Sequence, residues 1–137
     1  METLKEDILK VLNDNKIGPM ATLQGNKPYG RYMTFRNEEF ILYTTTDEDS
    51  QKVHDLQSNP YVHILLGYTN SDENTPPYIE YSGKLTEIKD DELKLKITNF
   101  FRSIFSSDKD DMVTLQIEPI SIKYYPGDGN PSQELIF

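Results

Sequence analysis

Two segments of the chain carry residue types that could bind an anion. The first is YTTTDEDSQK, residues 43–52, which begins with β-forming residues and ends with a serine and a lysine. If a helix begins near Ser50, its free N–H groups, the serine hydroxyl and the ammonium of Lys52 form a phosphate-binding corner. Alternatively, Ser50 and the aspartates only cap a helix, because three acids in the loop disfavour an anion unless they point to solvent.

Arg31 is the second candidate for an anion contact. Side chains alternate along the predicted strand YGRYMTFR. One face of that strand is predicted to carry Tyr29, Arg31, Met33 and Phe35. An arginine on an apolar, inward face is costly unless its charge is paired. Arg31 therefore either makes a salt bridge to one of the chain's acids or clamps a phosphate with two hydrogen bonds.

The residue types give little support to nucleophilic, metal-dependent or acid–base catalysis. The chain has no cysteine, which excludes disulfides, thiolate metal sites and cysteine nucleophiles. His54 and His63 do not stand at metal-ligand spacing, and we expect no metal. We interpret His54 as a surface or cap residue and His63 as a strand histidine beside a polar neighbour. No serine lies in a G-x-S-x-G elbow, and no side chain stands out as an acid–base catalyst.

Charge and hydropathy limit the partners. The formal net charge is −9 over 137 residues, and no run of Lys and Arg is present. Nucleic acid and anionic membrane surfaces are therefore disfavoured as partners. No apolar stretch approaches the roughly 18 residues of a membrane span, and the first residues do not resemble a signal peptide. We expect a cytoplasmic protein.

The hydrophobic periodicity predicts a mainly β protein with helices. An apolar stripe at Leu4, Ile8, Val11 and Leu12 predicts a helix over about residues 3–15. A short helix is expected before Asn59-Pro60, and another over residues 90–105. Strands are expected at residues 17–24, 29–36, 40–45, 61–68, 78–88 (with a bulge at Gly83) and 111–125, followed by a loop-rich tail.

Strands of hairpin length in succession predict an antiparallel sheet. We expect the first three strands to form a meander, and the six strands to close into a small barrel covered by the helices. Residues 1–137 are expected to form a single domain.

The order of these segments resembles the pyridoxamine 5′-phosphate oxidase-like family, the FMN-binding split barrels. GRYMTFR, then a strand ending in YTT, then SQKVHDLQSNP carry the resemblance, which covers about residues 3–125. The nearest type is the short bacterial general stress protein 26. The resemblance implies a six-stranded antiparallel split barrel with an N-terminal helix and two further helices, a homodimer with the cofactor site between subunits, and FMN as cofactor.

The resemblance also implies the roles of individual residues. Arg31, Ser50 and Lys52 match the phosphate contacts, and Gln51 stands where relatives commonly have an additional arginine. The backbone of Tyr32, Met33 and Thr34 would run along the flavin ring, and Tyr43 and Thr44 would line the ring and ribityl chain. Arg36 falls where relatives often carry a basic residue, and Tyr124 lies near the position of a common tryptophan.

Two features separate the chain from the oxidase proper. The loop between Thr44 and Ser50 is longer and more acidic, and we expect Asp47 to Asp49 to face solvent. The substrate-binding arginine and histidine of the oxidase's C-terminal segment have no counterpart before Phe137. We therefore expect FMN-dependent electron or hydride transfer with an unknown small substrate, and not oxidation of pyridoxamine phosphate. Alternatives are a non-catalytic FMN carrier or stress-related sensor, or the same fold with F420 or haem.

Overall fold

The computed structural model describes residues 2–47, 58–69, 75–105 and 112–137. Its helices are α1 (Glu2–Asp14) and α3 (Asp91–Phe105). Its strands are β1 (Ile17–Gln24), β2 (Lys27–Thr34), β3 (Arg36–Glu38), β4 (Ile41–Asp47), β5 (Tyr61–Leu66), β6 (Tyr78–Thr86), β7 (Met112–Tyr125) and β8 (Gln133–Ile136). The strands form one antiparallel sheet in the order β2-β1-β5-β6-β7-β4-β3, and β8 pairs with β7.

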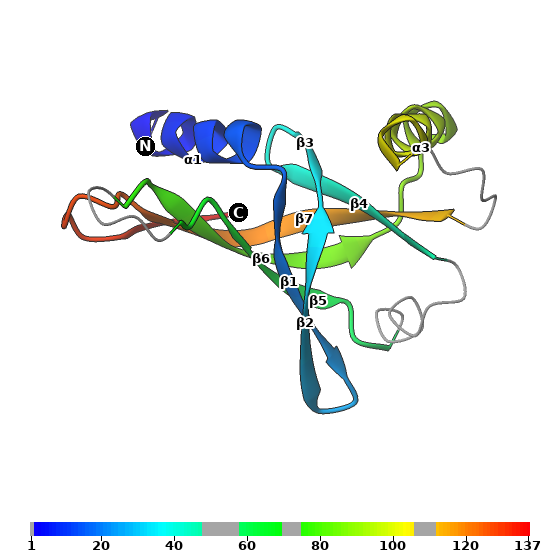
Figure 1. Ribbon diagram of the computed structural model, residues 1–137, viewed down its shortest axis with the longest axis horizontal. Coiled ribbons are helices and arrows are strands. Elements are labelled where there is room, and N and C mark those ends of the chain that lie inside the picture. Colours follow the sequence, from blue (N-terminus) through cyan, green and yellow to red (C-terminus); the bar gives the residue numbers. More distant parts are fainter. Residues whose placement is uncertain (1, 48–57, 70–74, 106–111) are drawn as a thin grey trace.

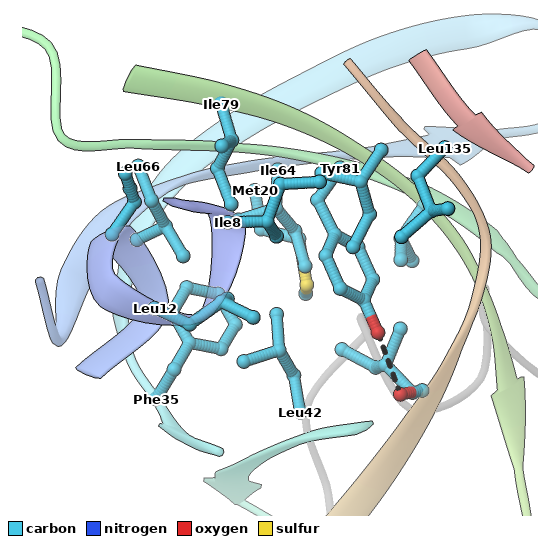
Figure 2. Packing of buried hydrophobic residues seen from close by; sticks show 14 of the residues in the cluster. Ile8, Leu12, Met20, Phe35, Leu42, Ile64, Leu66, Ile79, Tyr81 and Leu135 are labelled. Carbon is cyan, nitrogen blue, oxygen red and sulfur yellow. Dashed lines mark hydrogen bonds between the residues drawn. The ribbon is translucent and has the colours of Figure 1, made fainter. Parts of the chain in front are cut away.

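The main core lies between the sheet and α1. The predicted apolar stripe of α1 is buried, as the 3.6-residue period requires. Ile8 and Leu12 point toward Met20, Phe35 and other core side chains (Figure 2). The two helices lie on the same side of the long strands β6 and β7, over their opposite ends (Figure 1).

A second, smaller core lies under α3. Ile97 and Phe101 of that helix pack against Tyr43 of β4 and Ile88. Asp90 begins the helix by accepting the N–H of Glu92, an N-cap contact. Because α3 covers the face of β4 that points away from the main core, this strand is buried on both faces.

The sheet stays open between β2 and β4. We predicted a meander of the first three strands, and this was wrong: β4 pairs with β3 and β7, not with β2. A side-chain hydrogen bond bridges the opening, from the Thr44 hydroxyl to the Thr34 carbonyl at 2.8 Å. The structure is thus the predicted antiparallel split barrel, and the split runs between β2 and β4.

The strand count differs from the prediction: the described residues form eight strands instead of the expected six. The segment expected to turn after residue 36 contains β3, and the expected loop-rich tail contains β8. The predicted bulge is confirmed, since the register of β6 and β7 shifts between Ser82 and Gly83. The expected short helix lies almost entirely outside the described residues; Ser58, the one described residue of it, is helical.

Candidate functional site beside the barrel split

Arg31 lies on the edge strand β2 and is exposed. Its register partner on β1 is the buried Met20, so the side chain stands on the face of the sheet that carries the core, as predicted. Neither helix covers β2 there, and the guanidinium is left in solvent rather than buried. Among the described residues the Arg31 guanidinium makes no salt bridge or hydrogen bond, so the first of the two alternatives, an ion pair to an acid, is not found there. An exposed, unpaired guanidinium retains all five N–H donors for a ligand.

The rest of the β2 segment combines packing against the core with one edge that no described strand covers. Met33 is half-buried and packs against the main core, and the Thr34 carbonyl accepts the bridge from β4. Because β2 is the last strand on its side of the described sheet, alternate N–H and C=O groups along its free edge have no partner strand. These groups suit a planar ligand with hydrogen-bonding edges.

Tyr32 lies on the opposite face of β2 from Arg31. It pairs with Pro19 and stands in solvent. Its ring lines a cavity of about 400 Å³ on the outside of the sheet, together with Leu65, Tyr68 and Tyr125. The Tyr32 side chain therefore lies on the other face of the sheet from Arg31, and only its backbone lies beside Arg31. The resemblance assigns this backbone, not the side chain, to the cofactor.

Tyr43 and Thr44 are both buried, but on different faces of β4. The Tyr43 ring packs in the α3 cluster, and its hydroxyl donates to Gln116 Oε1 at 3.1 Å. Burial raises the pKa of this hydroxyl, so it stays a donor at neutral pH. The Thr44 hydroxyl links β4 to β2 across the split through its hydrogen bond to the Thr34 carbonyl. The Tyr43 side chain thus points away from the split, and Thr44 lies at it.

Replacing Tyr43 with phenylalanine tests this placement. We expect Tyr43→Phe to lower the free energy of unfolding by about 1 kcal/mol, because Gln116 loses a buried donor. We expect FMN affinity to stay within about twofold of wild type. Urea denaturation and FMN titration measure the two effects, with Tyr61→Phe as an exposed control. A large loss of FMN affinity would put the hydroxyl in the cofactor site.

Ser50, Gln51 and Lys52 lie outside the described residues, and so does His54. The described part of β4 ends at Asp47, five residues before Lys52. The predicted phosphate corner and the predicted outward orientation of the acids therefore stay predictions. Within the described chain, Arg31 is the phosphate-contact candidate that can be placed.

Arg36 is engaged by its neighbours. Its guanidinium lies 4.5 Å from the centre of the Phe100 ring and 3.1 Å from Glu38 Oε1. Lys96 of α3 lies 3.7 Å from the same carboxylate. This cluster fastens β3 to α3, so a structural role accounts for the arginine.

A polar network on the outer face of the sheet was only partly predicted. His63 Nδ1 lies 3.2 Å from the Ser82 hydroxyl, which confirms the expected polar neighbour. His63 Nε2 lies 3.7 Å from Glu80, and the Tyr125 hydroxyl donates to Glu80 at 2.5 Å. This hydrogen bond raises the pKa of Tyr125 to about 12. The signal in the sequence is alternation: these residues are the outward positions of three neighbouring strands.

Two further observations concern metals and membranes. Within the described ranges, no group of three or more His, Asp or Glu side chains could hold a metal ion. None of the described helices is long and apolar enough to cross a membrane.

The described chain is an antiparallel split barrel with an exposed arginine on its edge strand β2. The model of the pyridoxamine 5′-phosphate oxidase family matches residues 4–125. The chain is 38% identical over 124 residues to general stress protein 26 of Bacillus subtilis strain 168, covering 89% of this chain and 88% of that protein. The chain belongs to the pyridoxamine 5′-phosphate oxidase-like family.

Solved structures support the same assignment. General stress protein 26 from Bacillus anthracis overlays with a TM-score of 0.77 at 31% identity, over 98% of each chain. Two more distant structures share the fold alone. One is an F420 reductase, with 21% identity, a TM-score of 0.65 and coverage of 82% of this chain and 93% of that chain. The other is a FAD-binding protein from Mesorhizobium loti, with 17% identity, a TM-score of 0.68 and coverage of 85% and 90%.

Proposed function

We propose that the protein binds FMN at the barrel split and uses it for electron or hydride transfer with a small substrate. The observation that carries the proposal is Arg31: a solvent-exposed guanidinium without a protein partner among the described residues, on the edge strand beside Thr44. Such a group is available for a dianion, whereas a structural arginine would be paired. Family membership supports the same ligand.

The residues of the chain fit the chemical parts of FMN. In the proposed complex Arg31 binds the phosphate, and Ser50, Gln51 and Lys52 close around it from the following segment. In the complex the backbone of Tyr32, Met33 and Thr34 would run along the ring, and the edge of β2 at Tyr32 would offer N–H and C=O groups to it. When bound, the flavin accepts or donates a hydride equivalent, so the protein needs no nucleophile of its own. Its residues bind the phosphate, orient the ring and exclude water.

The proposal includes two copies of the chain and a cytoplasmic location. In a single copy, the described elements leave both Arg31 and Tyr32 exposed, so one copy offers only part of a cofactor pocket. A second copy would supply the missing wall, and the cofactor would lie between the subunits. Subcellular fractionation tests the location.

FMN is the cofactor that we propose among several related ones. The solved structures that share the fold include an F420 reductase and a FAD-binding protein from Mesorhizobium loti, which supports a flavin-type cofactor. Haem would require an axial ligand, for which the imidazoles are His54 and His63. His54 lies outside the described residues, and the ring nitrogens of His63 face Ser82 and Glu80. The absorption spectrum of the loaded protein separates these cofactors.

The experiment that tests the redox function is anaerobic reduction of FMN-loaded protein. We expect NADH or NADPH to bleach the flavin absorption, and an added acceptor to restore it over repeated cycles. Free FMN at the same concentration is the control. Loaded protein that reacts no faster than free FMN with either nucleotide contradicts the oxidoreductase and leaves the FMN carrier or sensor.

A further inference from the structure

A cavity of about 370 Å³ lies between α1 and the sheet. Its lining comes from α1, from the chain between β5 and β6, and from the end of β7, where α1 lies over the long strands (Figure 1). None of the described residues that we assign to the cofactor lines it. The volume falls within the range of about 300–1,000 Å³ that is typical of small-molecule sites. The cavity is therefore large enough for a ligand of its own.

The walls of this cavity are fixed by close backbone packing. Gly67, directly after β5, has a φ of 95°. A Cβ there would lie 3.0 Å from the Pro77 carbonyl oxygen and 3.1 Å from Val11 Cγ1 of α1, so only glycine allows this approach without displacement. Pro76 and Pro77 restrict the φ angles of the opposite wall. A ligand would thus enter a site that is already formed, which lowers the entropic cost of binding.

Asp7 is a carboxylate of the lining that has no partner. Its side chain is half-buried, and it makes no hydrogen bond or salt bridge within the part of the chain that the structure describes. The other charged residues of the lining are paired with each other, since Lys10 Nζ lies 2.9 Å from Asp14 Oδ2. A partly desolvated carboxylate without a partner costs free energy. A cationic donor in the cavity would offset that cost.

The other available polar atoms around the cavity are mostly acceptors. Asn15 Nδ2 donates to the Val11 carbonyl at 2.9 Å, which leaves the amide oxygen of Asn15 to accept. The Tyr124 hydroxyl is half-buried and makes no hydrogen bond to a described residue. Burial raises the pKa of Tyr124, and the charges of Asp7 and Asp128 raise it further, so this hydroxyl lies in a negative field. The last turn of α1 holds no basic residue, and its carbonyl end adds negative potential.

We propose that this cavity binds an organic cation, a primary ammonium group carried on a small apolar body. The ammonium donates to the Asp7 carboxylate and to the Tyr124 hydroxyl oxygen, and the apolar body packs against Val11 and Pro76. This site goes beyond the proposed function, and it exists whether or not the protein binds FMN.

Other classes of ligand fit the cavity less well. An anion would meet the Asp7 charge, and the Lys10 ammonium that could attract it is bound to Asp14. A metal ion would need several ligands, and the described residues include no group of three or more His, Asp or Glu that could hold one. A neutral apolar molecule would cover Asp7 without giving it a partner.

The test is a titration of the full chain followed by two-dimensional ¹H–¹⁵N NMR, with benzylamine and benzyl alcohol as probes. The two molecules have the same apolar body, and only benzylamine carries an ammonium at neutral pH. We expect benzylamine to cause saturable shifts at Val11, Asn15, Gly67 and Thr69, which line the cavity. Benzyl alcohol should bind at least about tenfold more weakly, because it forms no charge-assisted hydrogen bond with Asp7.

Variants of α1 and β7 assign the contacts. Asp7→Asn keeps the size of the side chain and should raise the dissociation constant of benzylamine about tenfold or more. Glu6→Gln is the matched control: it removes the same charge from the next residue of α1, outside the lining, and should change the constant less than about twofold. Tyr124→Phe keeps the ring and should raise the constant about threefold or more, which tests the site if Asp7→Asn fails to fold.

Three results would overturn the proposal. One is the absence of saturable benzylamine shifts at the lining residues, and another is equal binding of benzyl alcohol. The third is a loss of affinity in Glu6→Gln as large as that in Asp7→Asn, which would indicate the general negative field of the chain. Because the titration contains no flavin, failure of the FMN proposal leaves each of these results unchanged.

Discussion

Arg31→Ala should raise the dissociation constant of FMN about thirtyfold or more and leave that of riboflavin within about twofold of wild type. Loss of a charge-assisted hydrogen bond to a phosphate costs about 2 kcal/mol, and 1.4 kcal/mol corresponds to a tenfold change in affinity. Riboflavin lacks the phosphate, so it reports any indirect damage to the ring pocket. Titration followed by flavin fluorescence measures both ligands.

The Arg31 substitution should not disturb the fold. The side chain is exposed and has no hydrogen-bond partner among the described residues, so the free energy of unfolding should change by less than about 0.5 kcal/mol. Lys27→Ala is the matched control, because it removes an exposed cation from the start of the same strand. Equal losses in the two variants would indicate a general field effect rather than a clamp. Arg31→Lys should have an affinity for FMN between those of wild type and Arg31→Ala, because lysine keeps the positive charge but lacks the paired N–H donors of the guanidinium.

Phe101→Ala should lower the free energy of unfolding by about 3–5 kcal/mol. Phe101 lies on the inward face of α3 and is completely buried, and it packs with Tyr43, Ile88 and Ile97. Removing a buried phenyl ring loses its transfer free energy and leaves a cavity. Because native domains have only about 5–15 kcal/mol of stability, the variant is expected to be close to unfolding.

Phe105→Ala supplies the comparison on the same helix. Phe105 stacks on Phe101 but is about half exposed, so its removal should cost less than about 1 kcal/mol. Urea denaturation of the two variants gives the difference directly. Similar losses in both would mean that α3 does not bury one face of β4 as described, and the placement of Tyr43 would be wrong with it.

The helices and long strands could be predicted because their burial is periodic. A short apolar run gave β1 its correct bounds, and alternation placed Arg31 on the core side of β2. The 3.6-residue stripe gave α1 within one residue. The short strands could not be predicted in this way. The segments Arg36–Glu38 and Gln133–Ile136 are polar or too short for a pattern, and they are strands only because β4 and β7 offer them a paired edge.

The errors at the site have a physical origin in long-range pairing. The meander prediction assumed that neighbours in sequence pair, but β4 instead pairs with β7, more than 60 residues further along the chain. Because β4 pairs with β7 and not with β2, the sheet is open between β2 and β4, and α3 lies over one face of β4. Tyr43 points to the opposite face of β4 from Leu42 and Thr44, as expected for a strand. All three residues are buried, and no pattern in the sequence indicates that both faces of β4 are covered.

The most direct test of FMN binding at the split is a parallel titration of the purified chain with FMN and with riboflavin, followed by absorption and fluorescence. We predict saturable uptake of one FMN per subunit, an absorption spectrum of oxidised flavin, and an affinity for FMN at least about tenfold above that for riboflavin. Failure to take up FMN, or equal affinity for the two flavins, would contradict a phosphate clamp built on Arg31.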